Sequence, residues 1–476
     1  MTNPHSTEQA IAGQWRAGRG EAQLMLTDPG TGDTLSHYRA ASAEDIDQAL
    51  EACEAAAPAW ARTTATERAG MLRRAASLLR DRSAAIARQL TLEQGKPLTE
   101  AGREVEQAAL MLEWYAEEAR RSYGQTIPAS VPGLRLATLA QPIGPVAAFT
   151  PWNFPLMLSA IKVGAALAAG CPVILKPAEE TPSAPAALVR CLHEAGVPGG
   201  ALQLLLGVPA QISRALVESP VIRKLSFTGS TAVGRQLGAL AGAQLKPVTL
   251  ELGGHAAAIV CEDADLKAAV AALAGIKFRN AGQICANPSR FLVHRSHVAT
   301  FTDAFIGAAA ALRIGHGLEP GTTLGPLASA RRQQAVQALV EDARHRGARI
   351  TTVGEVPGKG FFVPPTVLTE LDEACRVLQE EPFGPLVPIV PFDTLDEAIA
   401  LANRLPVGLA AFGFTRNLHT ARHIAEEVNA GSVGLNATSL MLPEAPFGGV
   451  LDSGIGRENG SQGISAYLSL RTIATA

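Results

Sequence analysis

The chain has 476 residues, a formal net charge of −3, and 18% charged residues. Its length is enough for two or three domains with a large core, and its near-neutral charge provides no basic field that would bind nucleic acid. Its six cysteines form no C-x-x-C pair, so we expect no metal site and no disulfide framework, but a reduced protein of the cytoplasm.

The N-terminal part of the chain predicts turns followed by long helices. Residues 1–15 lack the apolar block of a signal peptide, and residues 20–40 carry turn signals. Ser42 with an acid three residues on resembles a capping box. Apolar residues at helical spacing predict helices from about residue 46, from 66 to about 95, and from about 99 to 121.

A protruding hairpin and an α/β segment come next. Residues 122–139 alternate in short pieces around prolines, which predicts a hairpin that extends from the body. The most apolar run, residues 156–175, contains Lys162 and a Gly-Cys-Pro break, so it predicts a buried helix and a strand, and we expect no membrane partner. Predicted strands lie at 146–149, 173–175, 202–206, 224–227 and 248–252, and helices at 156–169, 184–195 and 209–218.

This alternation predicts a parallel sheet that is covered by helices on both faces and binds ligands at the carboxyl ends of its strands. A second α/β region is expected downstream, so the predicted fold class is α/β. Its helices are expected at 266–278, 297–311, 328–346, 395–404 and 419–428, and its strands at 291–294, within 349–368, at 386–392 and at 432–435, before a strand-like tail at 466–473.

Three stretches contain groups that could act on a carbonyl. Cys285 lies among Gly282, Asn287 and Pro288, which disfavour regular structure and place a side chain at a surface or cleft, although an unreactive buried cysteine is the alternative. Glu251 lies in the strand predicted at 248–252, on the face opposite its apolar neighbours and just before a glycine pair, and Asn153 lies between two prolines. A thiol, a carboxylate and an amide donor suit covalent catalysis. A buried ion pair for Glu251 and a helix N-cap for Asn153 stay open.

Seven short motifs together resemble the NAD(P)-dependent aldehyde dehydrogenase superfamily, in that family's order and along nearly the whole chain. The resemblance implies a Rossmann-like cofactor domain, an α/β catalytic domain and a protruding β oligomerisation element, and hence a homodimer or homotetramer. The implied boundaries are 1–122 with 141–253 for the NAD-binding domain, 254–452 for the catalytic domain, and 123–140 with 453–476 for the oligomerisation element. The motifs lie at residues 151–155, 176–179, 227–230, 251–254, 282–285, 381–385 and 446–449.

The same resemblance implies a role for each candidate residue. Cys285 would be the nucleophile, Glu251 the general base and Asn153 the oxyanion donor. The residues implied to bind the cofactor are Trp152, Lys176, Glu179, Gly229, Ser230, Glu381 and Phe383. A carboxylate at Glu179 accepts hydrogen bonds from ribose hydroxyls and repels a 2′-phosphate, so NAD is expected, with NADP possible but less preferred.

Within the superfamily the chain is most similar to the succinate-semialdehyde dehydrogenase branch. Arg279, six residues before the nucleophile, suits a substrate that carries a carboxylate, and a structural salt bridge is the alternative. The position of a second arginine of that branch is Ile161 in this chain. The serine expected shortly before Pro446 is also replaced, around Met441 and Leu442. We therefore expect succinate semialdehyde or a similar semialdehyde, with a longer apolar or aromatic aldehyde as the alternative.

Two further alternatives concern the reaction itself. A CoA-acylating relative would pass the thioester to a thiol, but a hydrolytic base at Glu251 argues against it. An inactive structural relative is disfavoured because Cys285, Glu251 and Asn153 are all present. Asn287 replaces a cysteine that some members carry, so a disulfide switch at the nucleophile is not expected.

Overall fold

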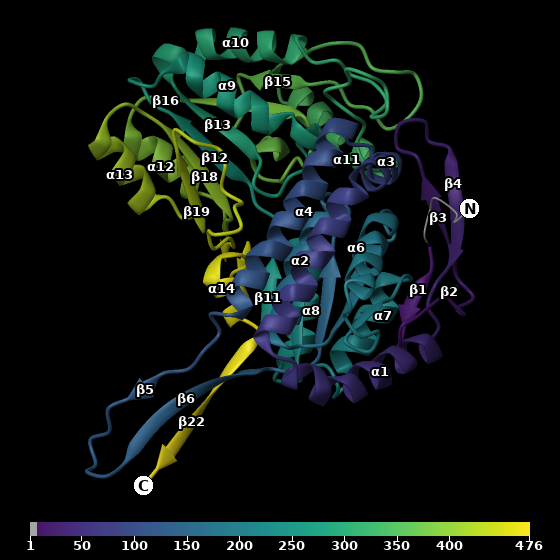
Figure 1. The fold of residues 1–476 in the computed structure, drawn as a ribbon. Coiled ribbons are helices and arrows are strands. Elements are labelled where there is room, and N and C mark those ends of the chain that lie inside the picture. Colours follow the sequence, from purple (N-terminus) through teal and green to yellow (C-terminus); the bar gives the residue numbers. More distant parts are fainter. Residues whose placement is uncertain (1–6) are drawn as a thin grey trace.

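The computed structural model describes residues 7–476. The prediction that residues 1–15 form no signal peptide therefore falls partly outside the described residues. Figure 1 shows two α/β bodies and a β arm that projects from them. No helix within residues 7–476 has the length and apolar character needed to cross a membrane.

The first body is built on an eight-stranded sheet in which the five central strands run parallel, and the strand that pairs with this parallel set on each side runs antiparallel to it. In order across the sheet the strands are β2 (Gln14–Arg16), β1 (Gln9–Ile11), β9 (Leu202–Leu204), β8 (Val173–Pro177), β7 (Val146–Thr150), β10 (Lys224–Thr228), β11 (Val248–Glu251) and β21 (Gly454–Ile455).

Helices cover both faces of this sheet, as the sequence predicts. Alternate residues of β7 face opposite cores: Val146 and Ala148 pack in one apolar cluster, and Ala147 and Phe149 in another. The helices on the first face are α2 (Ala65–Asp81), α3 (Ser83–Gln94), α4 (Leu98–Ala119), α5 (Pro155–Ala169) and α6 (Ser183–Glu194). Those on the second face are α1 (Ala43–Arg62), α7 (Pro209–Glu218) and α8 (Thr231–Ala243).

The second body has a seven-stranded sheet, parallel except for β14. Its strands in order are β14 (Arg349–Thr352), β15 (Thr366–Thr369), β16 (Leu386–Phe392), β13 (Pro288–His294), β12 (Ala256–Val260), β18 (Ala410–Phe414) and β19 (Ser432–Leu435). Its helices are α9 (Leu266–Lys277), α10 (Val298–Ala310), α11 (Ala330–His345), α12 (Leu395–Asn403) and α13 (Leu418–Glu427). The α/β fold class is confirmed for both bodies.

The arm is a three-stranded antiparallel sheet of β5 (Thr126–Ile127), β6 (Arg135–Pro142) and β22 (Leu468–Thr475), and the C-terminus lies at its far end (Figure 1). The segment after residue 452 does not belong to the arm alone. In that segment β21 joins the first sheet, and the short helix α14 (Gly460–Ser465) packs on α4 and α5.

The N-terminal part differs from the prediction in two ways. Residues 9–39 contain two β-hairpins that were not predicted, namely β1 with β2, and β3 (Gln23–Thr27) with β4 (Thr34–Arg39), although the turn signals at 28–32 do lie in the connection between β3 and β4. The helix expected from 66 to about 95 is two helices, α2 and α3, which are separated at Arg82. Its apolar periodicity continues across the break, which is why the pattern predicted one helix. The capping box at Ser42 and Asp45 is confirmed.

Candidate active site

Two cavities meet at Cys285. The first has a volume of about 390 Å³ and the second about 370 Å³, and Asn153 and Cys285 line both of them. Cys285 is half-buried in the loop between the 3₁₀ helix η1 (Arg279–Gly282) and β13. The prediction that this thiol lies at a cleft is therefore confirmed, and a reactant in either cavity would lie beside the sulfur.

The thiol of Cys285 is held in its protonated form in the free protein. Burial raises its pKa to about 12, the carboxyl groups of Glu381 and Glu251 act in the same direction, and the backbone N–H groups of Cys285 and Ala286 oppose them. The thiolate is the nucleophilic form of a cysteine. Attack by this sulfur therefore requires a group that accepts its proton as the new bond forms.

A strained turn precedes the thiol. Asn280, Ala281 and Gly282 all have left-handed backbone conformations, with φ of 50°, 52° and 79°. Such a conformation costs a non-glycine residue about 1–3 kcal/mol, so contacts around the turn must hold it in place. One contact is the hydrogen bond from the backbone N–H of Asn280 to a carboxylate oxygen of Glu100, at 2.8 Å. A side chain at position 282 would clash with the carbonyl oxygen of Gly384, which explains the glycine there.

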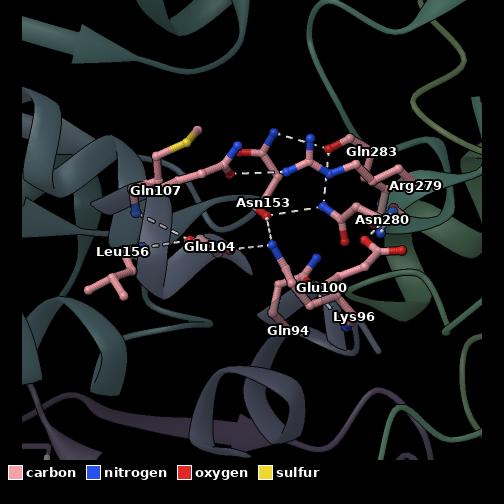
Figure 2. Close-up of polar contacts among 11 residues, drawn as sticks. Gln94, Lys96, Glu100, Glu104, Gln107, Asn153, Leu156, Arg279, Asn280 and Gln283 are labelled. Carbon is pink, nitrogen blue, oxygen red and sulfur yellow. Dashed lines mark hydrogen bonds and ion pairs between the residues drawn. The ribbon is translucent and has the colours of Figure 1, made fainter. Parts of the chain in front are cut away.

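Asn153 lies against this turn (Figure 2). Its side-chain Nδ2 donates to the carbonyl oxygen of Gln283 at 3.1 Å, while its Oδ1 is buried without a hydrogen-bond partner. The N-cap alternative for Asn153 is wrong because the N-cap of α5 is Phe154, and that helix has no side-chain cap. The bond to Gln283 uses one N–H of the amide and leaves the other available at the meeting point of the cavities.

Glu251 is the last residue of β11 and is 4% exposed. Both carboxyl oxygens are buried without a hydrogen-bond partner. Among the described residues Glu251 therefore does not form the buried ion pair that was the alternative. Burial raises its pKa well above the ordinary value, with a further increase from Glu458 and a partial offset from Lys162. Among residues 7–476, those that line the two cavities do not include Glu251. Its carboxyl group must therefore turn, or act through water, to reach the sulfur.

The second cavity contains most of the residues implied to bind a nicotinamide cofactor. Its lining includes Trp152, Gly229, Ser230, Glu381 and Phe383. The rings of Trp152 and Phe383 meet edge to face with centroids 5.5 Å apart.

The features of this cavity fit a dinucleotide. Ser230 is the N-cap of α8, so free N–H groups of the first helical turn are available to a phosphate. The hydroxyl of Thr228, which also lines the cavity, is buried without a hydrogen-bond partner, as expected where a polar ligand binds. A Cβ at Gly253 would lie 2.8 Å from Oε2 of Glu381, so only glycine lets this carboxyl group approach the strand end.

Lys176 lies near the end of β8 in the same sheet, and Glu179 follows that strand. Lys176 is buried in β8, and its Nζ lies 3.3 Å from Oε2 of Glu179, whose side chain is 35% exposed. Lys176 is therefore not part of a solvated turn. Both residues lie at the carboxyl edge of the parallel sheet, where such sheets bind nucleotides.

The first cavity is mostly apolar, and Arg279 is the one charged residue among the described residues that line it, beside polar Gln107, Thr438 and Ser439. Arg279 donates from Nη2 to Oε1 of Gln107 at 3.1 Å, and its guanidinium lies over the ring of Phe154, 5.3 Å from the centroid. No carboxylate of the described residues forms an ion pair with Arg279, so the structural salt-bridge alternative is wrong. The apolar lining consists mainly of Phe154, Met157, Leu158, Ile276, Ile284, Leu440, Met441 and Leu442.

Several residues of the site have no signal in the local sequence. Gln107 reaches Arg279 from α4, and Arg332 lies over Phe383 in the second cavity and donates to the carbonyl oxygen of Pro382. Each comes from a helix whose pattern indicates only an amphipathic surface. His255, for which the sequence offered no role, is buried between Ser289 and the carbonyl oxygen of Val377 and is a packing residue.

The chain belongs to the aldehyde dehydrogenase family, whose model matches residues 15–473. Membership of this family makes the protein an oxidoreductase that acts on aldehydes and uses NAD or NADP, which confirms the resemblance seen in the sequence.

Relatives of known name match nearly the full length. The 4-(hydroxymethyl)benzenesulfonate dehydrogenase TsaD1 of Comamonas testosteroni is 50% identical over 464 residues, which cover 98% of this chain and 97% of the relative. The succinate-semialdehyde dehydrogenase [NADP(+)] GabD of Escherichia coli is 41% identical over 472 residues, covering 99% and 98%. The crystal structure of succinate-semialdehyde dehydrogenase from Burkholderia pseudomallei superposes with a TM-score of 0.98 at 42% identity, covering 100% of this chain and 99% of that one.

Proposed function

We propose that the protein oxidises an aldehyde with a remote anionic group to the carboxylic acid, with NAD as acceptor and Cys285 as nucleophile. The observation that carries this proposal is that Asn153 and Cys285 line both cavities. The aldehyde carbon would enter from the first cavity and bond to the sulfur as the thiol releases its proton to solvent water, and the free N–H of Asn153 with the backbone N–H of Cys285 would stabilise the oxyanion. A nicotinamide bound in the second cavity would accept the hydride, which leaves a thioester on Cys285.

Hydrolysis of the thioester is assigned to Glu251. A carboxylate with a raised pKa is an effective base once it is ionised, because its proton affinity is close to that required at neutral pH. The carboxyl group of Glu251 is buried near Cys285 and influences the thiol pKa. We therefore assign Glu251 as the base that activates water against the thioester carbon.

The substrate class follows from the first cavity. Arg279 is the one cation among the described residues that line this mostly apolar cavity, and a guanidinium binds a carboxylate or sulfonate through two parallel N–H donors. Ile161, which replaces the second arginine of the succinate-semialdehyde branch, is 1% exposed in the core, and Met441 and Leu442 line the cavity. These features favour an anionic aldehyde whose spacer is aromatic or long rather than a short semialdehyde. The name of the Comamonas relative, which refers to a benzenesulfonate, supports this choice.

Arg279→Leu tests the substrate class. For aldehydes with a remote charge, 4-formylbenzenesulfonate and succinate semialdehyde, kcat/KM should fall by about 10²-fold, because each loses a charge-assisted hydrogen-bonded pair. For benzaldehyde and butanal, which lack the charge, it should change by less than about threefold. Arg103→Leu, an exposed arginine on the same helix as Gln107, is the control. Equal losses for charged and uncharged aldehydes would rule out the assigned contact.

The preference for NAD is argued from this chain's own Glu179, since the Escherichia coli relative is named for NADP(+). A carboxylate repels a 2′-phosphate and accepts hydrogen bonds from ribose hydroxyls, and Lys176 offsets that charge only in part because the two residues are paired. The native protein should have the higher kcat/KM with NAD. Glu179→Gln should shift the NAD/NADP ratio toward NADP by about tenfold, and Glu194→Gln, an exposed acid on α6, should not. A native preference for NADP would overturn this assignment.

The domain boundaries given from the sequence, and a homo-oligomer formed through the arm, are part of this proposal. The arm strand β22 is an exposed edge with apolar Leu470 and Ile473 on its surface, and an unpaired edge of this length favours pairing with another chain. We therefore keep the inference of a homodimer or homotetramer formed through the arm.

A further inference from the structure

A buried ion pair lies directly behind Asn153. Nζ of Lys96 is 2.5 Å from Oε2 of Glu104, and both side chains are fully buried. Lys96 belongs to the short turn between α3 and α4, and Glu104 to the second turn of α4. Burying two charges costs several kcal/mol of desolvation per ion, so such a pair is weak evidence for a stabilising role. Its other contacts indicate what it does.

The pair binds the chain at Asn153 and again a few residues after it (Figure 2). The ammonium of Lys96 donates to the carbonyl oxygen of Asn153 at 2.7 Å. The second carboxylate oxygen of Glu104 accepts from the backbone N–H groups of Leu156 and Met157, at 2.9 and 3.3 Å. These N–H groups belong to the first turn of α5, which has no N-cap side chain of its own. Glu104 therefore caps α5 from a different helix, and Lys96 fixes the residue that precedes this helix.

The strained turn before Cys285 also binds the backbone of Asn153. Nδ2 of Asn280 donates to the same carbonyl oxygen of Asn153 at 3.0 Å, and Asn153 donates in turn to Gln283. The backbone of Asn153 is thus held by a cation from the first body and by an amide from the strained turn before Cys285. With the carbonyl fixed, the amide side chain has one N–H assigned to Gln283 and a second N–H that can still donate, on a residue that lines both cavities.

We propose that Lys96 is a positioning residue, which with Glu104 sets the oxyanion donor Asn153 at the distance from Cys285 that the tetrahedral oxyanion requires. This inference rests on the proposed role of Asn153. An oxyanion donor displaced by a fraction of an ångström loses much of its effect, because stabilisation depends on preorganised geometry. The consequence is specific: reactions of the thiol that form an oxyanion depend on Lys96, and reactions that form none do not.

Two reactions of the same thiol test this proposal without a cofactor. In the first, 4-nitrophenyl acetate acylates Cys285: sulfur bonds to the carbonyl carbon through a tetrahedral oxyanion, 4-nitrophenolate leaves, and the thiol proton is released to solvent. In the second, iodoacetamide alkylates the sulfur at a saturated carbon, iodide leaves, and no oxyanion forms. The rate constant of the 4-nitrophenolate burst measures the first reaction, and mass spectrometry of the alkylated protein measures the second.

Lys96→Met in the full-length protein should slow the acylation burst by at least about tenfold, with Asn153→Ala slowing it by about 10²-fold. Alkylation should stay within about threefold of the native rate in both variants. The double variant K96M/E104Q avoids an unpaired buried carboxylate and should show the same pattern if Lys96→Met alone fails to fold. Arg68→Met is the matched control, because Arg68 is a buried cation that binds the carbonyl of Ala168 near the opposite end of α5.

The outcomes separate the inference from the function on which it rests. If Asn153→Ala slows acylation and the Lys96 variants do not, the positioning role is wrong while the role of Asn153 stands. If Lys96→Met slows both reactions equally, or no more selectively than Arg68→Met, Lys96 is a structural residue and the inference is overturned. If Asn153→Ala leaves acylation unchanged, the proposed oxyanion donor itself is wrong.

Discussion

Replacing Cys285 with alanine should abolish aldehyde oxidation, with kcat falling by at least about 10⁴-fold, because the proposed covalent intermediate forms on its sulfur. The two cavities meet at this sulfur, so the variant should retain both binding spaces. We expect NADH formation to fall to background while the affinity for NADH, measured by fluorescence titration, changes by less than about threefold.

Cys261→Ala is the matched control for this prediction. Its thiol is also buried with a pKa of about 12, but it lies at the end of the second sheet, where it packs against α12 and α13 in place of lining a cavity. This variant should keep nearly native turnover. If Cys285→Ala retained more than about a tenth of native kcat, a mechanism through this sulfur would be untenable.

Glu251→Gln should separate oxidation from hydrolysis. The first turnover should still release about one NADH per active site at close to the native rate, and the steady state that follows should be slower by about 10²- to 10³-fold, because a general base contributes about that much. Stopped-flow absorbance of NADH measures both phases. Glu118→Gln is the control, because Glu118 is 5% exposed against 4% for Glu251 and lies on α4, away from the cavities.

The pH dependence supplies a second readout for Glu251. Because the folded-state pKa of this carboxyl is raised, the group is protonated below that pKa and becomes a base only above it. The native steady-state rate should therefore rise with pH as this carboxyl group ionises, and Glu251→Gln should lose that rise. Full steady-state activity in Glu251→Gln would refute the assignment, and a native steady state that required added CoA would favour the acylating alternative.

The sequence predicted the parts of the fold that local patterns control. Helix α7 begins at the proline that fixes its first turn, and the predicted range 209–218 matches Pro209–Glu218. Strands β7 and β8 were visible because strands buried on both faces are continuous apolar runs. Strands β1 and β2 were missed because each has three residues, and β1 is fixed by pairing with β9 far along the chain. The break at Arg82 was missed because no glycine or proline marks it.

The residues of the site also divide into those that local sequence patterns predicted and those that they missed. The motifs around Asn153 and Cys285 predicted correctly that these two residues come together, since both line the same two cavities. Gln107, which lies 172 positions from Arg279, was missed because helical periodicity indicates which residues share a face, not which loop that face meets. Lys96 was missed for a similar reason, because a lysine in a Gly-Lys-Pro turn reads as a solvated end of a helix, and only tertiary packing buries it against Glu104.

Trapping the acyl-enzyme tests the central assignment most directly. Glu251→Gln mixed with NAD and 4-formylbenzenesulfonate, quenched in acid after the burst, should gain the mass of the aldehyde less two hydrogen atoms, and peptide mapping should place the addition on Cys285. Native protein treated in the same way should show much less of this adduct, because hydrolysis removes it. Turnover of the aldehyde with no adduct on Cys285 in the variant would contradict the account.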